Sequence, residues 1–157
     1  MLKLSTKGRY GLRAMIELAR IYNNGPLMMS AITKRQEISR KYLHAILTAL
    51  KGAGLVRAVR GAKGGFMLAK DPGDIGVHEI YAALEGKLSI VDCVTNETIC
   101  GRVEVCETRD MWRQLNDAMF KVLSGVTLAD LVKKPTDNIL REPDMCAPKR
   151  RKNTTSQ

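Results

Sequence analysis

Acidic side chains are almost absent from the first half of the chain. Residues 1–70 contain 14 lysines and arginines but only two acids, Glu17 and Glu37, which gives a net charge of +12. Residues 71–157 carry 12 basic and 14 acidic side chains, a net charge of −2. An excess of positive charge could serve solubility alone. A basic half joined to a nearly neutral half predicts instead a polyanion-binding module attached to a second unit.

The sequence also lacks any apolar run of the roughly 18 residues that a membrane span requires. It opens without a long apolar stretch followed by a small-residue cleavage site, so no secretory leader is expected. Aromatic residues make up only 4% of the chain, which leaves the core to aliphatic side chains and methionine. We therefore expect a cytoplasmic protein with no membrane partner. In that compartment four cysteines favour metal ligands or redox groups over structural disulfides.

A catalytic arrangement is missing as well. The chain has no recognisable Ser/His/Asp or Cys/His set and no pair of carboxylates in a cleft-forming motif. Its glycine-rich segment at 61–65 is not followed by a helix with a Lys-Ser or Lys-Thr start, so it is not a nucleotide-binding loop. The two histidines, His44 and His78, are not close to the cysteines in sequence. The sequence thus predicts a protein that is not an enzyme.

Apolar residues at helical spacing predict four helices in residues 1–86, and two short apolar segments around a glycine-rich turn predict a β-hairpin. The helices are expected at about 6–22, 31–37, 40–51 and 77–84, and the strands at 55–59 and 66–69. Ser5 or Thr6, Ser30 and Ser39 are the expected helix caps. Helix, short helix, Ser-capped helix and hairpin is the order of elements in a winged helix-turn-helix domain.

The second half of the chain predicts one long helix after an irregular segment. Residues 87–105 have no periodicity, whereas a helix is expected from Cys106 to about Ser124. Its apolar residues cover more than one side, so it must be buried on more than one side, and a second subunit is the expected cover. The expected units are a DNA-binding domain at 1–86, a loop at 87–105, a dimerisation helix with a short last helix at 106–133, and a disordered tail at 134–157. The fold class is mainly α with a small β-hairpin wing: a winged helix-turn-helix with a long dimerisation helix.

A helix-turn-helix places the start of its second helix against base edges in the major groove of double-stranded DNA. The DNA-binding residues predicted at that position are Ser39, Arg40, Lys41, Tyr42 and His44. The wing adds Arg60, Gly61, Lys63 and Gly64. Cations at these positions reach phosphates or guanine edges, and glycines let the backbone approach a narrow groove. Two simpler interpretations remain: a histidine that is an ordinary surface residue, and glycines that serve only the dihedral angles of the turn.

Three cysteines form the second candidate site. Cys93, Cys100 and Cys106 are spaced Cys-x6-Cys-x5-Cys, which is neither the Cys-x2-Cys spacing of zinc sites nor a ferredoxin run. Three thiolates on one loop could bind one metal centre, and the start of a helix would stabilise the Cys106 thiolate. The alternative is three unrelated thiols. Cys146 lies in the expected tail and is not expected to be a ligand.

These residues resemble one family, the winged-helix iron–sulfur transcriptional regulators of the IscR, NsrR and CymR type. The resemblance covers about residues 1–133. It rests on the segments LSTKGRYGL at 4–12, ISxxYL at 38–43 and LVxxxRGxxGGF at 55–66, on the three cysteines, and on Trp112. It implies a homodimer built on the long helix, which binds a pseudo-palindromic operator through two winged helices.

The resemblance also implies an iron–sulfur cluster held by Cys93, Cys100 and Cys106, with 2Fe-2S favoured over 4Fe-4S. The state of the cluster would control operator affinity in response to redox conditions, nitric oxide or cluster supply. Two departures bear on the fourth ligand: Arg109 stands where the iron–sulfur cluster regulators of this family have a histidine, and Gly8-Arg9 stands where the nitric-oxide sensors borrow an acidic ligand from the partner subunit. Glu104, Glu107 and Asp110 are the carboxylates nearby in sequence. The first cysteine gap is also one residue longer than the common form, which leaves the cluster type open. The alternative is a cluster-free repressor of the same fold that senses a thiol modification or a ligand.

Overall fold

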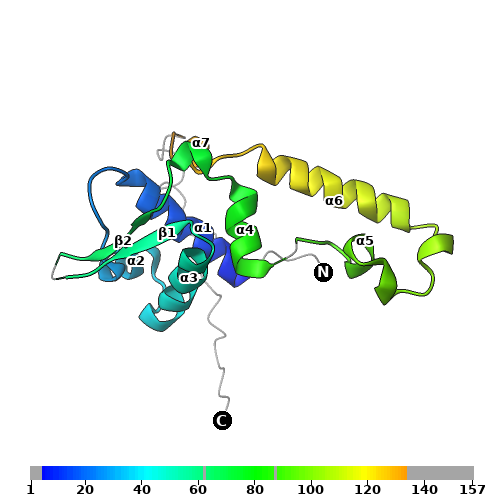
Figure 1. Ribbon diagram of the computed structural model, residues 1–157, viewed down its shortest axis with the longest axis horizontal. Helices are drawn as coiled ribbons and strands as arrows, with labels where there is room; N and C mark the ends of the chain where they lie inside the picture. The colour runs from blue at the N-terminus through cyan, green and yellow to red at the C-terminus, as the bar shows by residue number, and fades with distance from the viewer. Residues whose placement is uncertain (1–4, 62, 87, 134–157) are drawn as a thin grey trace, which may run out of the picture.

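The computed structural model describes residues 5–61, 63–86 and 88–133, so the predicted tail at 134–157 lies outside the described residues (Figure 1). The helices are α1 (Thr6–Arg20), α2 (Met29–Gln36), α3 (Arg40–Gly52), α4 (Val77–Glu85), α5 (Asp92–Thr95), α6 (Arg109–Ser124) and α7 (Leu128–Lys133). The strands are β1 (Val56–Val59) and β2 (Gly65–Leu68). Short 3-10 turns lie at Pro72–Asp74, Glu97–Ile99 and Val103–Val105. The mostly helical fold with one hairpin confirms the predicted fold class.

The hydrophobic core of the winged domain lies between α1, α3 and α4. The apolar face predicted for α3 is fully buried, and it consists of Leu43, Ile46, Leu47 and Leu50. Helix α1 approaches α4 closely because two glycines face it. A Cβ atom built on Gly8 would lie 2.5 Å from the Tyr81 ring, and one on Gly11 would overlap the side chain of Leu84. The glycines at 8 and 11 therefore have a packing role, since any larger side chain would push the two helices apart.

Two of the predicted helix caps are present and one is not. Ser5 caps α1 by accepting a hydrogen bond from the Gly8 N–H at 3.0 Å, and Ser39 caps α3 by accepting one from the Tyr42 N–H at 3.3 Å. The cap predicted at Ser30 is wrong, because α2 already begins at Met29. The N-cap residue is Met28, which directly follows the residue whose backbone pairs with Phe66.

That pairing connects Leu27 to the wing. Its N–H donates to the carbonyl of Phe66 at 2.8 Å, and the Phe66 N–H donates back at 2.9 Å. The hairpin itself is antiparallel, with Val56 opposite Leu68 and Val59 opposite Gly65. Gly65 lies so close to the Leu27 carbonyl that a Cβ atom would overlap it. The wing is thus attached to the segment between α1 and α2 through backbone hydrogen bonds that require a glycine.

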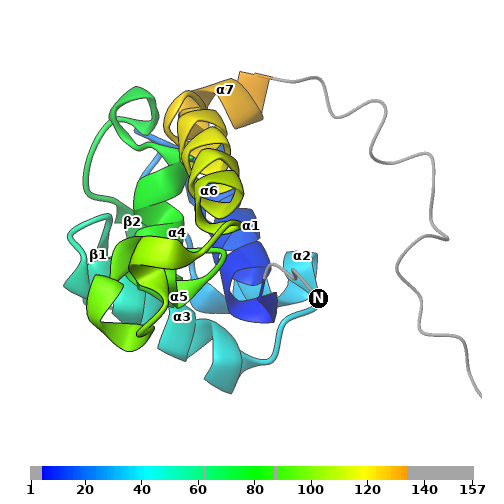
Figure 2. The same cartoon turned by 90° about the vertical axis from the view of Figure 1, so that its right-hand side faces the viewer.

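Helix α6 extends away from the winged domain, with the irregular segment of residues 88–108 running beside it (Figure 1). In the perpendicular view it is seen almost end-on (Figure 2). Helix α7 then returns to the winged domain. The Leu128 N–H donates to the Ile75 carbonyl at 2.8 Å, the Val77 N–H donates to the Val126 carbonyl at 2.9 Å, and Leu128 is fully buried. The chain that follows α6 is therefore connected to the start of α4 by backbone hydrogen bonds. Among the described residues, no helix has the length and apolar character needed to cross a membrane.

Candidate nucleic-acid interface and cysteine segment

The first turns of α3 carry most of the predicted DNA-binding residues. Arg40, Lys41 and His44 are exposed, and together with Met29 of α2 they line a hollow of about 530 Å³. Tyr42 points elsewhere: it is half-buried and meets the ring of Tyr10 edge-on, with the ring centroids 6.0 Å apart. The start of α3 thus presents two cations and an imidazole on one outward surface, while its tyrosine packs against α1.

The cations of this region fall into two groups according to their partners. Arg20 and Arg35 both pair with the buried carboxylate of Glu17, at 2.9 and 3.0 Å. In contrast, no ion pair is formed by Arg40 or Lys41 with any residue that the structure describes. No described carboxylate neutralises these two charges, and a surface with such an excess of positive charge favours polyanions.

The tip of the wing has the same character. Arg60 and Lys63 are exposed and have no carboxylate partner in the described part of the chain. Gly61 has φ +110°, a backbone conformation that residues other than glycine rarely adopt. A Cβ atom on Gly64 would overlap the Val59 carbonyl oxygen. The turn itself therefore requires both glycines, and contact of their backbone with DNA remains a prediction. The hairpin extends away from the helical core (Figure 1).

The three predicted cluster ligands lie on one segment but at three different local structures. Cys93 belongs to α5, Cys100 follows the turn at 97–99, and Cys106 precedes α6. All three are half-buried free thiols. Within residues 5–61, 63–86 and 88–133, no three histidine, cysteine or acidic side chains are close enough together to hold a metal ion. Three thiols are donors of the type that an iron–sulfur cluster requires. In this structure they do not converge on one point.

Cys106 differs from the other two in its electrostatic environment. Helix α6 begins at Arg109 rather than at the predicted Cys106, which remains extended before the N-cap residue Thr108. The pKa of the Cys106 thiol is lowered first by the Thr108 hydroxyl, 3.4 Å from the sulfur, and then by the backbone N–H of Thr108. The N–H of Arg109 contributes in the same direction. The start of α6 therefore favours the thiolate, the form that binds metals and reacts with oxidants.

Arg109, three residues beyond Cys106, offers no ligand to a metal. A guanidinium stays protonated in proteins and offers no lone pair to a metal. Its side chain is only 14% exposed and forms an ion pair with Glu97. Its Nε atom is buried without a partner among the described residues. Arg109 instead connects the start of α6 to the turn between Cys93 and Cys100.

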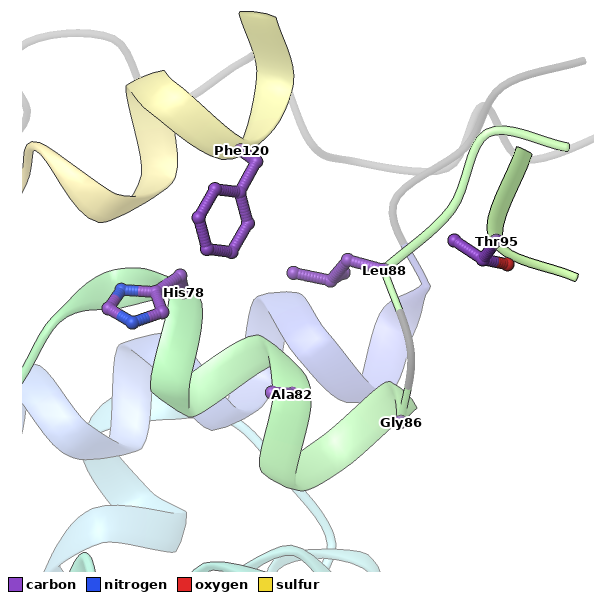
Figure 3. A pocket seen from close by; sticks show the side chains of 6 residues that line it. All are labelled: His78, Ala82, Gly86, Leu88, Thr95 and Phe120. Carbon is purple, nitrogen blue, oxygen red and sulfur yellow. The ribbon is translucent and has the colours of Figure 1, made fainter. Parts of the chain in front are cut away.

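An apolar groove of about 350 Å³ separates α4 from α6 (Figure 3). The ring of Phe120 faces His78 across it, with centroids 5.6 Å apart, and Leu88 lies beside them. The Nδ1 atom of His78 is buried and has no hydrogen-bond partner in the described part of the chain. His78 thus packs between α4 and α6.

Helices α2 and α3 and the antiparallel hairpin that follows them define this protein as a winged helix-turn-helix protein. The profile described as "Rrf2: Iron-dependent Transcriptional regulator" matches residues 4–134. The chain belongs to this Rrf2 family of transcriptional regulators, and the relatives to which it is similar are regulators, not enzymes.

Individual relatives support the assignment. The chain is 38% identical to the HTH-type transcriptional regulator CymR of Bacillus subtilis (strain 168). The alignment spans 130 residues, which are 83% of this chain and 89% of CymR. The solved structure of CymR, described as the global cysteine regulator of B. subtilis, superimposes with a TM-score of 0.73 at 40% identity and covers 84% of this chain and 97% of that chain. That of T. potens IscR gives 0.70 at 35% identity and covers 94% of both chains. The expected family is thus confirmed.

Proposed function

We propose that this protein is a sequence-specific, DNA-binding transcriptional regulator that acts as a homodimer. One observation carries the proposal: the cations at the start of α3 and at the wing tip are exposed and lack carboxylate partners in the described chain. Other arginines of the same domain are neutralised by Glu17. In a helix-turn-helix, the start of the second helix reads base edges and the flanking cations bind phosphates.

The homodimer part of the proposal rests on α6, none of whose residues is buried within one chain. One stripe of this helix consists of Met111, Leu115, Ala118 and Val122, spaced at i, i+4, i+7 and i+11. Met111, Leu115 and Val122 are 51%, 46% and 66% exposed. Large apolar side chains in such a row require a partner surface, and two copies of this helix complement each other in the manner of a coiled coil.

The DNA-binding proposal is tested by selecting duplexes from a random library with the wild-type protein and titrating the selected duplex at several salt concentrations. If four cations per subunit, Arg40, Lys41, Arg60 and Lys63, contact phosphate, the slope of log K against log salt is expected to be about −7 for a dimer, and steeper by about 1 for each further phosphate contact. Fluorescence anisotropy on a labelled duplex measures it. A slope shallower than about −2, or a library from which no sequence is enriched, would contradict the proposal.

We further propose that the cysteine segment is the sensory element and that Cys93, Cys100 and Cys106 hold an iron–sulfur cluster, with 2Fe-2S favoured. Support comes from three half-buried free thiols on one segment and from the lowered pKa of Cys106. A bound cluster would supply a group that responds to redox state or nitric oxide. Cluster binding requires this segment to bring its thiols together. Since the segment connects α4 to α6, such a rearrangement would alter how the winged domains are held in the dimer.

Protein purified without oxygen is expected to be coloured, with visible absorption bands and an iron-to-protein ratio of about two for a 2Fe-2S cluster or about four for a 4Fe-4S cluster. The triple variant Cys93→Ser, Cys100→Ser, Cys106→Ser is expected to be colourless, and its affinity for the selected duplex should differ from that of the coloured protein. Wild-type protein that stays colourless after anaerobic reconstitution with iron and sulfide would favour the alternative, a cluster-free repressor that senses a thiol modification or a ligand. The similarity to the global cysteine regulator CymR is compatible with that alternative.

A further inference from the structure

Arg13 of α1 is an exposed arginine whose guanidinium is held in one place. Its Nε donates to the side-chain oxygen of Gln36 at 2.6 Å, and a second nitrogen donates to the backbone oxygen of Gln36 at 3.3 Å. The guanidinium carbon also lies 5.4 Å from the ring centroid of Tyr10, within the range of a cation–π contact. An exposed arginine normally samples many rotamers, so these contacts remove much of the entropy that binding would otherwise cost.

A buried group fixes the amide that holds Arg13. The Gln36 amide nitrogen donates to Glu17 at 2.8 Å, and the Glu17 side chain is only 3% exposed. Because the amide nitrogen is engaged by the carboxylate, the amide oxygen must point outward, where it accepts from Arg13. The carboxylate is already shared by Arg20 and Arg35. Its charge therefore orients Arg13 through Gln36 without forming an ion pair with it.

Arg13 also lies beside the candidate DNA-binding surface. Tyr10, over which its guanidinium lies, meets the ring of Tyr42 in the first turn of α3. No described carboxylate forms an ion pair with Arg13, so its charge and its remaining N–H donors are free, as they are at Arg40 and Lys41. A planar, always charged group with free donors binds phosphate oxygens well.

We propose that Arg13 binds a phosphate of the DNA backbone beside the groove that α3 enters, so that the phosphate-binding surface continues from α3 across Tyr42 and Tyr10 onto α1. This inference rests on the proposed DNA-binding function and adds to it a contact outside the helix-turn-helix pair and the wing. The Gln36 side chain acts as the positioning residue. Both subunits of a dimer would contribute one such contact.

The test compares Arg13→Ala with wild-type protein on the same selected duplex across a salt series. Loss of two phosphate contacts per dimer is expected to make the slope of log K against log salt shallower by about 2 and to weaken binding about ten- to hundredfold at about 0.1 M salt. Arg13→Gln, which keeps part of the aliphatic side chain but not the charge, is expected to show the same slope as Arg13→Ala. Gln36→Leu leaves the charge in place, so it should weaken binding less than either variant and retain more of the slope.

Lys51→Ala is the matched control. It removes the same charge from the last turn of α3, about 16 Å along the helix from Arg40, and is expected to leave the slope unchanged. Thermal unfolding identifies any variant that has lost its fold, in which case Arg13→Gln decides. Slopes of Arg13→Ala and Arg13→Gln equal to that of wild type would overturn the role of Arg13 alone. A wild-type protein without salt-dependent binding would overturn the DNA-binding function itself, and Arg13 with it.

Discussion

Operator affinity is expected to fall at least about a thousandfold when Arg40 and Arg60 are both replaced by alanine. Each arginine that contacts a phosphate or a guanine edge contributes about 1–3 kcal/mol, and a dimer would lose four such contacts, about 4 kcal/mol or more. Both side chains are exposed and unpaired with the residues that the structure describes, so their removal breaks no internal ion pair. The folded state should therefore melt at the wild-type temperature, and anisotropy titration on the selected duplex measures the loss.

The two single variants divide this effect. If Arg40 reads a base, Arg40→Ala relaxes the sequence preference at one position of each half-site, which a repeat of the library selection detects. If Arg60 binds the backbone or a narrow minor groove, Arg60→Ala weakens all duplexes to a similar extent and makes the salt slope shallower by about 2. Lys51→Ala again serves as the charge-matched control. Wild-type affinity in the double variant would remove both α3 and the wing from the DNA-binding surface.

The variant Leu115→Glu is expected to convert the dimer into folded monomers, with a dimer dissociation constant raised at least about a thousandfold. Burial of a leucine side chain contributes about 1.5–3 kcal/mol, and a symmetric interface contains two of them. The variant also brings two carboxylates into an apolar contact, where desolvation disfavours both. In one chain Leu115 is 46% exposed, so the monomer keeps its own core. Sedimentation velocity measures the change.

Gln114→Glu is the charge-matched control for this prediction, since residue 114 is exposed and lies off the apolar stripe of α6. It should remain dimeric. Monomers of Leu115→Glu can occupy only one half-site each, so their affinity for the selected duplex should also decrease strongly. A Leu115→Glu protein that remains dimeric would place the subunit interface elsewhere, and the groove between His78 and Phe120 would then be the next surface to test.

Local features of the fold were predictable because they depend on residues close together in sequence. The buried face of α3 follows from Leu43, Ile46 and Leu47, which recur at helical spacing. Its start follows from Ser39, whose hydroxyl accepts from a backbone N–H three residues later. The wing turn follows from glycines such as Gly61, because a positive φ is costly for any other residue. Family-typical segments around these positions extended the prediction to the whole winged domain.

Features that depend on distant residues were not predictable in the same way. Helix α2 begins at Met29, directly after a segment that pairs with Phe66, nearly forty residues away in sequence, and not at the local cap signal of Ser30. The sequence gives no local sign that Arg109 pairs with Glu97. It also could not show that Cys93, Cys100 and Cys106 remain separate in one chain, since spacing limits how far apart thiols can be but does not bring them together.

The sequence by itself determined the class of this protein. It predicted a basic domain with a Ser-capped helix for contact with DNA and a glycine-rich turn, followed by a helix whose apolar surface requires a partner. Periodicity, capping and charge are properties of neighbouring residues, so they can be read without coordinates. Only the tertiary structure decided which cations are available to a ligand. Arg20 and Arg35 are neutralised by buried Glu17, whereas Arg13 is held by Gln36 with its charge unpaired by any described residue. Arg35 and Arg13 each find their partner on another helix, so only the packing of α1 against α2 determines whether such a charge is satisfied by described residues or directed outward.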